Sequence, residues 1–256
     1  MSKKRQIIFW ASILVLAACV GYIVYYYAGQ SQNKKAYEDL KQEVVKEPTA
    51  EPETEPVADD PQPVEIPIDF AALQAQNPDI YAWITIPGTE VAYPVVQSAT
   101  DNSYYLDYTI DGVYGYPGSI YTENYNSRDF TDFDTVIYGH DMNDGSMFGT
   151  LKSYRDETFL NEHRQIIIYT PDHIRTYQVF AAVTYDDRHI LQTFDFTQSE
   201  QRQSYLNSIN SCQSGDDHVM NDAAVDVNSR IITLSTCISS QPNNRYLIEA
   251  VLVNEQ

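Results

Sequence analysis

A cysteine and an arginine stand at the ends of two predicted strands near the C-terminus. Cys237 follows the apolar run at residues 231–236, and Arg245 begins the next apolar run after the polar residues 238–244. If the two runs pair, the seven intervening residues form a connecting loop, and Cys237 and Arg245 face each other across its mouth. Strand ends can hold a reactive side chain and expose it at the same time.

A histidine occupies a similar place elsewhere in the chain. His140 follows the strand pattern at residues 136–138, and Gly139 permits a sharp exit from that strand. A thiolate is a nucleophile, a histidine can protonate a leaving amine, and a guanidinium can brace a developing oxyanion. Together the three side chains suffice for acyl transfer through a thioester. An inert buried cysteine, a loop histidine and a surface arginine stay open as alternatives, because 97 residues separate His140 from Cys237.

Other chemistry has little support in the sequence. The chain has no glycine-rich phosphate loop, no Cys-x-x-Cys pair and no His-Glu-x-x-His, so we expect neither a cofactor nor a metal site. With 16 basic and 36 acidic residues the net charge is −20, which argues against nucleic-acid binding. Four further histidines in polar sequence are expected to be solvated, namely His163, His173, His189 and His218. Cys212 is expected to be a small apolar residue, with a disulfide to Cys237 as an alternative.

Differences in amino-acid composition divide the chain into three parts. We expect three parts: a cytoplasmic tip and membrane anchor at residues 1–29, an acidic Pro/Glu-rich disordered stalk at 30–66, and a folded domain at 67–256. Roughly eight strand patterns without regular helical crossovers predict a mainly β barrel or sandwich. The strands are expected at residues 81–86, 91–96, 118–121, 135–138, 165–169, 174–184, 230–236 and 246–253, and the helices at 69–76, 154–162 and 198–212.

The N-terminal segment has the character of a membrane anchor. Residues 7–28 carry no charge and follow Lys3, Lys4 and Arg5, a length and a charge pattern that predict a single span with its N-terminus in the cytoplasm. Everything after residue 28 would then lie outside the cell. Residues 16–19 resemble a lipoprotein cleavage box with Cys19 as the lipidated residue, but the apolar run continues past Cys19, which favours an uncleaved anchor.

Several segments resemble one enzyme family. Thr-Leu-Ser-Thr-Cys at residues 233–237 resembles the Thr-Leu-x-Thr-Cys signature of sortases, the cysteine transpeptidases of Gram-positive bacteria. Tyr-Gly-His at 138–140 resembles the segment of the catalytic histidine, and Asn-Arg-Tyr at 244–246 that of the catalytic arginine. Similarity to class B members extends over residues 77–84, 93–97, 101–106, 147–151 and the helical insert at 198–212.

The resemblance implies an eight-stranded barrel and a two-step reaction. Cys237 would attack the threonine carbonyl of a C-terminal sorting signal in a secreted protein, and an amine of the peptidoglycan precursor would release the acyl-enzyme. His140 would act as acid and then as base, while Arg245 would stabilise the oxyanion or position the substrate. The resemblance also implies that three further residues line the peptide groove, namely Asn102, Leu106 and Ser235.

The sequence leaves some alternatives open. Residues 238–242 contain no acid, although some relatives carry one just after the cysteine, and Asp141 is the nearest carboxylate candidate. The signal could be Asn-Pro-x-Thr-Asn-like or Pro-x-Thr-Gly-like. A pilus-type sortase would use a lysine of the next pilin subunit as its acceptor. A plain cysteine protease would use water, and a non-catalytic surface barrel would have an inert Cys237.

Overall fold

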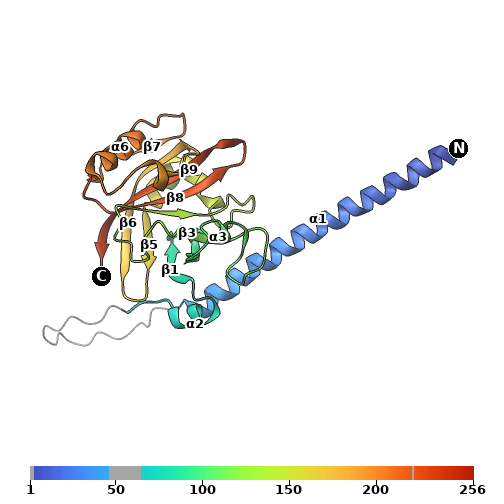
Figure 1. The fold of residues 1–256 in the computed structure, drawn as a ribbon, viewed down its shortest axis with the longest axis horizontal. Helices are drawn as coiled ribbons and strands as arrows, with labels where there is room; N and C mark the ends of the chain where they lie inside the picture. The colour runs from blue at the N-terminus through green and yellow to red at the C-terminus, as the bar shows by residue number, and fades with distance from the viewer. Residues whose placement is uncertain (1–2, 46–64, 221) are drawn as a thin grey trace. The chain divides into compact units, whose positions relative to one another are not determined.

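The computed structural model describes residues 3–45, 65–220 and 222–256 (Figure 1). Within it the chain forms two compact units, Met1–Leu40 and Lys41–Gln256. The first consists of a helix, whose final residues belong to the second. The second unit contains the β-sheet and all the shorter helices.

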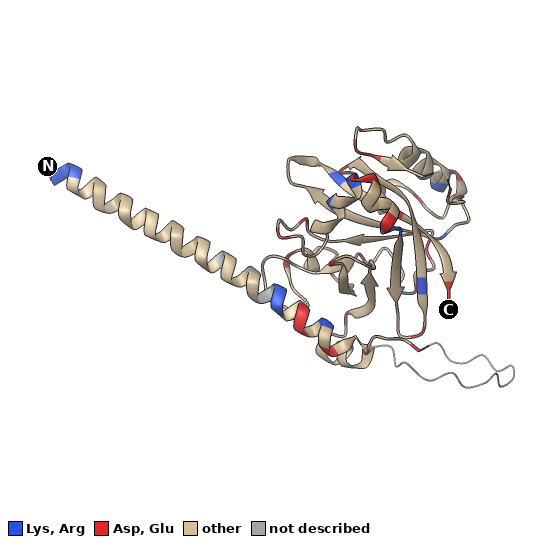
Figure 2. Cartoon of the chain, turned by 180° about the vertical axis from the view of Figure 1, so that it is seen from behind, with Lys and Arg blue, Asp and Glu red and all other residues tan. Residues whose placement is uncertain are grey.

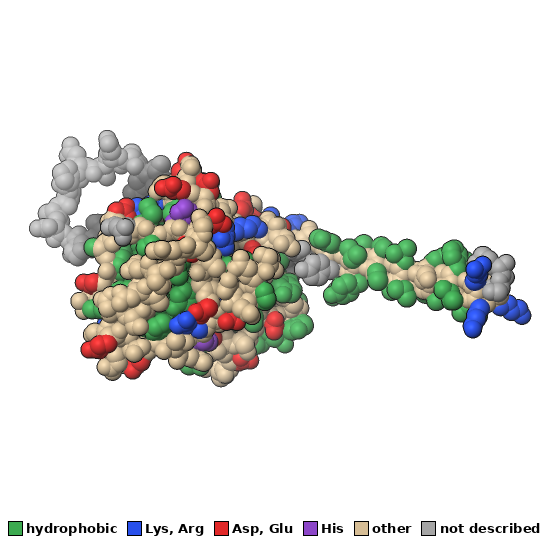
Figure 3. Space-filling view, turned by 90° about the horizontal axis from the view of Figure 1, so that it is seen from above, with side chains coloured by type: hydrophobic (Ala, Val, Ile, Leu, Met, Phe, Trp, Pro, Cys, Tyr) green, Lys and Arg blue, Asp and Glu red, His purple; other side chains and the backbone are tan. Residues whose placement is uncertain are grey.

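Helix α1 (Lys3–Val44) contains the uncharged segment at residues 7–28. It is long and apolar enough to cross a membrane. In Figure 2 basic residues mark its first turn and a long uncharged stretch follows, and in Figure 3 apolar side chains surround that stretch. The helix continues to Val44, so the predicted stalk is helical over residues 30–44, which are rich in helix formers and contain no proline. The Pro/Glu-rich tract at 47–56 lies outside the described residues.

Eight strands close into a barrel, as the sequence analysis predicted. Their order around the ring is β5-β1-β2-β3-β4-β8-β9-β6, and β5 pairs with β6 to close it. The short β7 pairs with β6 outside the ring. The strands are β1 (Ile80–Thr85), β2 (Ala92–Val96), β3 (Ile120–Thr122), β4 (Asp134–Tyr138), β5 (Gln165–Tyr169), β6 (Ile174–Asp186), β7 (His218–Val219), β8 (Ile231–Ile238) and β9 (Gln241–Glu255).

Short helices fill the connections between strands. They are α2 (Phe70–Gln76), α3 (Tyr104–Asp107), the 3-10 helix η1 (Gly149–Arg155), α4 (Glu157–Glu162), α5 (Ile190–Thr193) and α6 (Ser199–Asn210). The predicted helix at 154–162 is in fact two helices, because the Asp156 side chain accepts a hydrogen bond from the Phe159 amide at 2.9 Å and starts a new helix. Helix α6 buries Tyr205, Leu206 and Ile209.

Two buried carboxyl groups share a hydroxyl beneath α6. Asp134 of β4 and Glu249 of β9 are fully buried, and the Thr233 hydroxyl lies 3.0 Å from an oxygen of each. The Tyr205 hydroxyl donates to Glu249 at 2.8 Å. Burial raises the pKa of Glu249 to about 8, and burial together with the neighbouring Glu249 raises the pKa of Asp134. The pair therefore holds protons at pH values where an exposed carboxyl group is ionised.

This pair predicts a stability that falls as the pH rises. Between the ordinary carboxyl pKa and about 8, the native state holds a proton on Glu249 that the unfolded chain has released, so raising the pH favours unfolding. We expect the melting temperature to drop between about pH 5 and about pH 8.5, and to drop less in Glu249→Gln, which is neutral throughout. The melting temperatures are measured by near-UV circular dichroism. Glu162→Gln, at an exposed position, is the control; an equal drop in all three proteins would contradict the prediction.

Candidate active site

Cys237 and Arg245 are direct partners on adjacent strands. The β8–β9 pairing is antiparallel and places Cys237 opposite Arg245, as the sequence analysis expected. The expected loop at residues 238–244 is wrong, because pairing continues to Ile238 and Gln241 across a register shift and leaves a two-residue turn. Cys237 is exposed at the end of this hairpin. Arg245 Nη1 donates to the carbonyl oxygens of Pro242 and Asn244 at 3.0 and 2.9 Å, which orients the guanidinium.

His140 reaches the same place because β4 runs parallel to β8. Tyr138 lies opposite Ser235 in that pairing, so the residues after both strands leave the barrel together. The Thr236 hydroxyl donates to the Gly139 carbonyl oxygen at 2.7 Å and ties the two strand ends. A Cβ on Gly139 would lie 2.5 Å from Ile120 Cδ1 and 2.8 Å from Cγ of the buried Phe148 ring. Close packing therefore requires a glycine here.

One cavity of about 270 Å³ is lined by Cys237, His140 and Arg245 together. His140 Nε2 lies 2.7 Å from the Leu106 carbonyl oxygen, which can only accept, so Nε2 carries a hydrogen. The Tyr116 ring packs against the imidazole, with 4.9 Å between ring centroids. These contacts hold the ring at the edge of the cavity. A nucleophile, a proton carrier and a fixed cation around one cavity are the components of acyl transfer through a thioester.

The residues expected to line a peptide groove separate into two groups. Leu106 and Ser235 line the cavity. Asn102 lies outside the residues that line it, and its side-chain oxygen accepts a hydrogen bond from the Asn124 amide at 2.7 Å. Asn102 therefore orders the loop after β3 in this structure.

His189 belongs to a wall of the cavity that the sequence did not indicate. His189 was expected to be solvated, but it lines the cavity and its Nε2 lies 2.7 Å from Glu123 Oε2. Glu123 lines the cavity too and accepts from the Tyr138 hydroxyl at 3.3 Å. Nothing in the polar sequence around His189 indicates a partner 66 residues away.

Two of the other three histidines, which were expected to be solvated, are half-buried and contact a backbone carbonyl oxygen. His163 and His218 are half-buried, with ring nitrogens 2.9 Å from the Pro87 carbonyl oxygen and 3.0 Å from the Arg155 carbonyl oxygen. His173 is exposed as predicted.

The two cysteines of the barrel and the carboxylate next to His140 were also considered in the sequence. Cys212 and Cys237 are free thiols, so the disulfide alternative is wrong for this structure. Cys212 packs against the apolar cluster under α6, and burial raises its pKa to about 11. Asp141 is only 14% exposed, and it accepts from the Ser239 hydroxyl at 2.9 Å. Within the described ranges no group of three or more His, Cys, Asp or Glu side chains is arranged to hold a metal ion.

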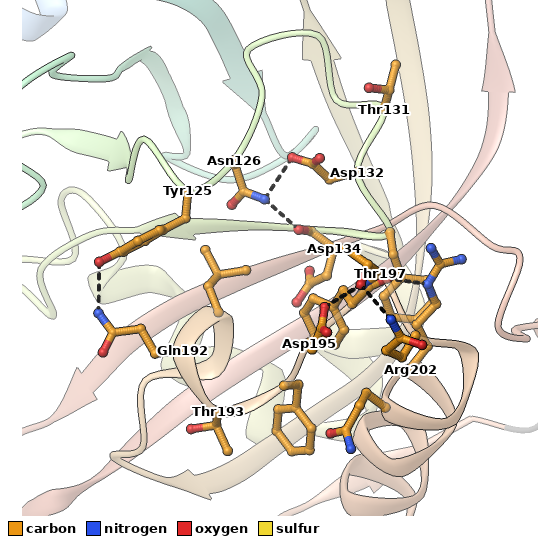
Figure 4. Close-up of a pocket in the computed structure, with 16 residues that line it drawn as sticks. Tyr125, Asn126, Thr131, Asp132, Asp134, Gln192, Thr193, Asp195, Thr197 and Arg202 are labelled. Carbon is orange, nitrogen blue, oxygen red and sulfur yellow. Dashed lines mark hydrogen bonds between the residues drawn. The ribbon is translucent and has the colours of Figure 1, made fainter.

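A larger cavity of about 880 Å³ lies elsewhere, between the segment before β4 and the insert carrying α5 and α6 (Figure 4). Asp132, Asp195 and Arg202 contribute to its lining, and Arg202 donates to the carbonyl oxygens of Phe196 and Val227. None of the three residues singled out for chemistry lines it. Size alone therefore does not identify the reactive cavity.

Comparisons with known proteins agree with this geometry. A family model described as the sortase domain matches residues 84–253. Sortase B of Listeria monocytogenes is 33% identical over 196 residues, covering 75% of this chain and 76% of that protein. Sortase B of Staphylococcus aureus is 30% identical over 195 residues, covering 72% and 74%.

Solved structures give the same result. The crystal structure of sortase B from B. anthracis has a TM-score of 0.71 and 30% identity, covering 89% of this chain and 99% of that chain. The S. aureus sortase B–substrate complex has a TM-score of 0.68 and 27% identity, covering 88% and 98%. The chain therefore belongs to the sortase family, as a sortase B-like cysteine transpeptidase.

Proposed function

We propose that the chain is a membrane-anchored transpeptidase that cleaves C-terminal sorting signals after threonine and joins the released protein to an amine of the peptidoglycan precursor. The observation that carries this proposal is the single cavity lined by Cys237, His140 and Arg245. Cell-wall anchoring is typical of the family to which the chain belongs.

In the first step the Cys237 thiolate, with His140 protonated, attacks the carbonyl carbon of the threonine. The S–C bond forms while the carbonyl oxygen gains negative charge, which the Arg245 guanidinium, opposite Cys237 in the β8–β9 pairing, stabilises. His140 gives a proton to the leaving amine as the peptide bond breaks. A thioester on Cys237 and a neutral His140 remain.

The sorting signal would lie in the cavity with its threonine at Cys237. Leu106, exposed over 41% of its surface, offers an apolar contact at the mouth, and Ser235 lies on the cavity side of β8. Asn102 is proposed to act on this groove through the loop that it holds at Asn124.

Helix α1 suits an anchor at the outer face of the cell membrane. Its uncharged residues 7–28 are preceded by Lys3, Lys4 and Arg5, and the excess of basic residues favours a cytoplasmic N-terminus. The catalytic domain would then be extracellular, where both a secreted protein and a lipid-linked acceptor arrive.

A peptide panel tests the proposal. The full chain in detergent micelles is mixed with quenched fluorescent peptides that contain Asn-Pro-x-Thr-Asn, Ser-Pro-x-Thr-Gly, Pro-Pro-x-Thr-Gly or Leu-Pro-x-Thr-Gly. We expect one motif to be cleaved after threonine, with a Cys237-linked acyl-enzyme visible by mass spectrometry. Cleavage of none of the four, with no acyl-enzyme on Cys237, would overturn the proposal.

A further inference from the structure

A second cavity touches Cys237 from another side. It measures about 490 Å³ and shares only Thr236 and Cys237 with the cavity that also contains His140 and Arg245. Its other walls come from the exit of β4, helix η1, the β8–β9 turn and β9. They consist of Asp141, Lys152, Arg155, Ile238, Ser239, Ser240 and Tyr246.

Strand geometry explains why the nucleophile borders both cavities. Successive side chains of a strand point to opposite faces, and Arg245 lines the first cavity while Tyr246, the next residue of β9, lines the second. Cys237 lies at the end of β8, opposite Arg245 and next to the turn. An acyl group on Cys237 is therefore open to approach from the second cavity while the first one is filled.

The lining of the second cavity suits a peptide amine. Asp141 carries a carboxylate there, 3.9 Å from Lys152 Nζ, and the lysine side chain is 52% exposed. The Tyr246 side chain is buried, and its hydroxyl has no hydrogen-bond partner among the described residues. The Arg155 guanidinium covers the Tyr246 ring at 4.4 Å from its centroid. An anionic oxygen attracts an amine, and the exposed lysine can bind a carbonyl or a carboxylate.

We propose that this second cavity is the acceptor site, which binds the amine-bearing peptide that attacks the thioester. The inference rests on the proposed function, because it needs an acyl group on Cys237. The amine binds near Asp141 and loses its ammonium proton to water. Its nitrogen then forms a bond to the thioester carbon, the C–S bond breaks with its electron pair on Sγ, and neutral His140 takes the proton from nitrogen. The products are an amide, the Cys237 thiolate and a protonated His140.

The test compares two nucleophiles on the same acyl-enzyme. Triglycine and Nα-acetyl-lysine are peptide amines that need a binding site, whereas hydroxylamine is small enough to react without one. The full chain in detergent micelles is given the sorting peptide that it cleaves, together with both nucleophiles. The measured quantity is the ratio of peptide-amine product to hydroxylamine product. Asp141→Asn is expected to lower this ratio about tenfold, the loss of one charge-assisted contact.

Two further variants sharpen the result. Ser240→Trp places a large side chain in the second cavity and is expected to suppress peptide-amine transfer relative to hydroxylamine. Asp172→Asn, in the exposed turn between β5 and β6, is the matched control and should leave the ratio unchanged.

Each outcome decides between distinct conclusions. An unchanged ratio in Asp141→Asn and Ser240→Trp, or an equal loss with both nucleophiles, would overturn the acceptor site and leave the transpeptidase proposal intact. Wild-type protein that acylates hydroxylamine but neither peptide amine would also overturn it. A wild-type protein that forms no acyl-enzyme at all would refute the proposed function itself.

Discussion

Cys237→Ala is expected to abolish cleavage of the sorting peptide and formation of the acyl-enzyme, with a loss of at least about 10⁴-fold in rate. The variant retains the barrel, the cavity and Arg245, but no atom remains to form the thioester. Cleavage is followed by fluorescence and the acyl-enzyme by intact mass. Cys212→Ala is the matched control, because Cys212 lines neither cavity at Cys237 and should be dispensable for activity.

Thiol labelling gives the same prediction an independent readout. Cys237 is exposed, whereas burial raises the pKa of Cys212 to about 11 and keeps it a neutral thiol. We expect iodoacetamide to modify Cys237 in the folded protein and Cys212 only after unfolding, as mapped by peptide mass spectrometry. Residual cleavage by Cys237→Ala, or a Cys237 that resists alkylation in the folded protein, would favour a non-catalytic binding barrel.

His140→Asn is expected to lower kcat/KM by about 10²–10⁴-fold, because the leaving amine then departs without a proton from the enzyme. The loss should be much smaller for a substrate with an ester in place of the scissile amide, since an alcohol leaves more readily than an amine. Measuring both substrates across the pH range separates a role in proton transfer from a role in folding.

The control for this prediction is His173→Asn, in the exposed turn between β5 and β6. It should retain full activity on both substrates. If His140→Asn lost equal activity on the amide and the ester, the histidine would be holding the fold of the site through its Leu106 contact, and the proposed acid–base role would be wrong.

Local patterns were enough to predict most of the barrel. Strands were predicted at residues 81–86 and 91–96, and β1 and β2 form there and pair antiparallel. A helix was predicted from residue 69, and the Asp69 carboxylate accepts from the Ala72 amide at 3.0 Å where α2 begins. The opposition of Cys237 and Arg245 followed from two neighbouring strands in the sequence. These features depend on residues close together in the chain, which is why the sequence reports them.

Contacts between residues far apart in the chain could not be predicted from local patterns. His140 meets Cys237 through the parallel β4–β8 pairing, and spacing alone could not predict it; the likeness to a known family supplied that expectation. The His189–Glu123 contact joins two polar segments that show no periodicity. The length of β9 was also missed, because Pro242, Asn243 and Asn244 read as a loop while antiparallel pairing with β6 extends to Asn244.

The order of strands around the ring also sets the order in which the enzyme can become active. β8 and β9 are the last strands of the chain, yet they fill the gap between β4 and β6. Until they insert, the sheet has two open edges and Cys237 has no Arg245 beside it. A chain whose last two strands have not yet been inserted therefore carries His140 but no assembled nucleophile site. Closure of the barrel and completion of the proposed catalytic set are the same event, so the topology itself would keep an unfinished chain inactive.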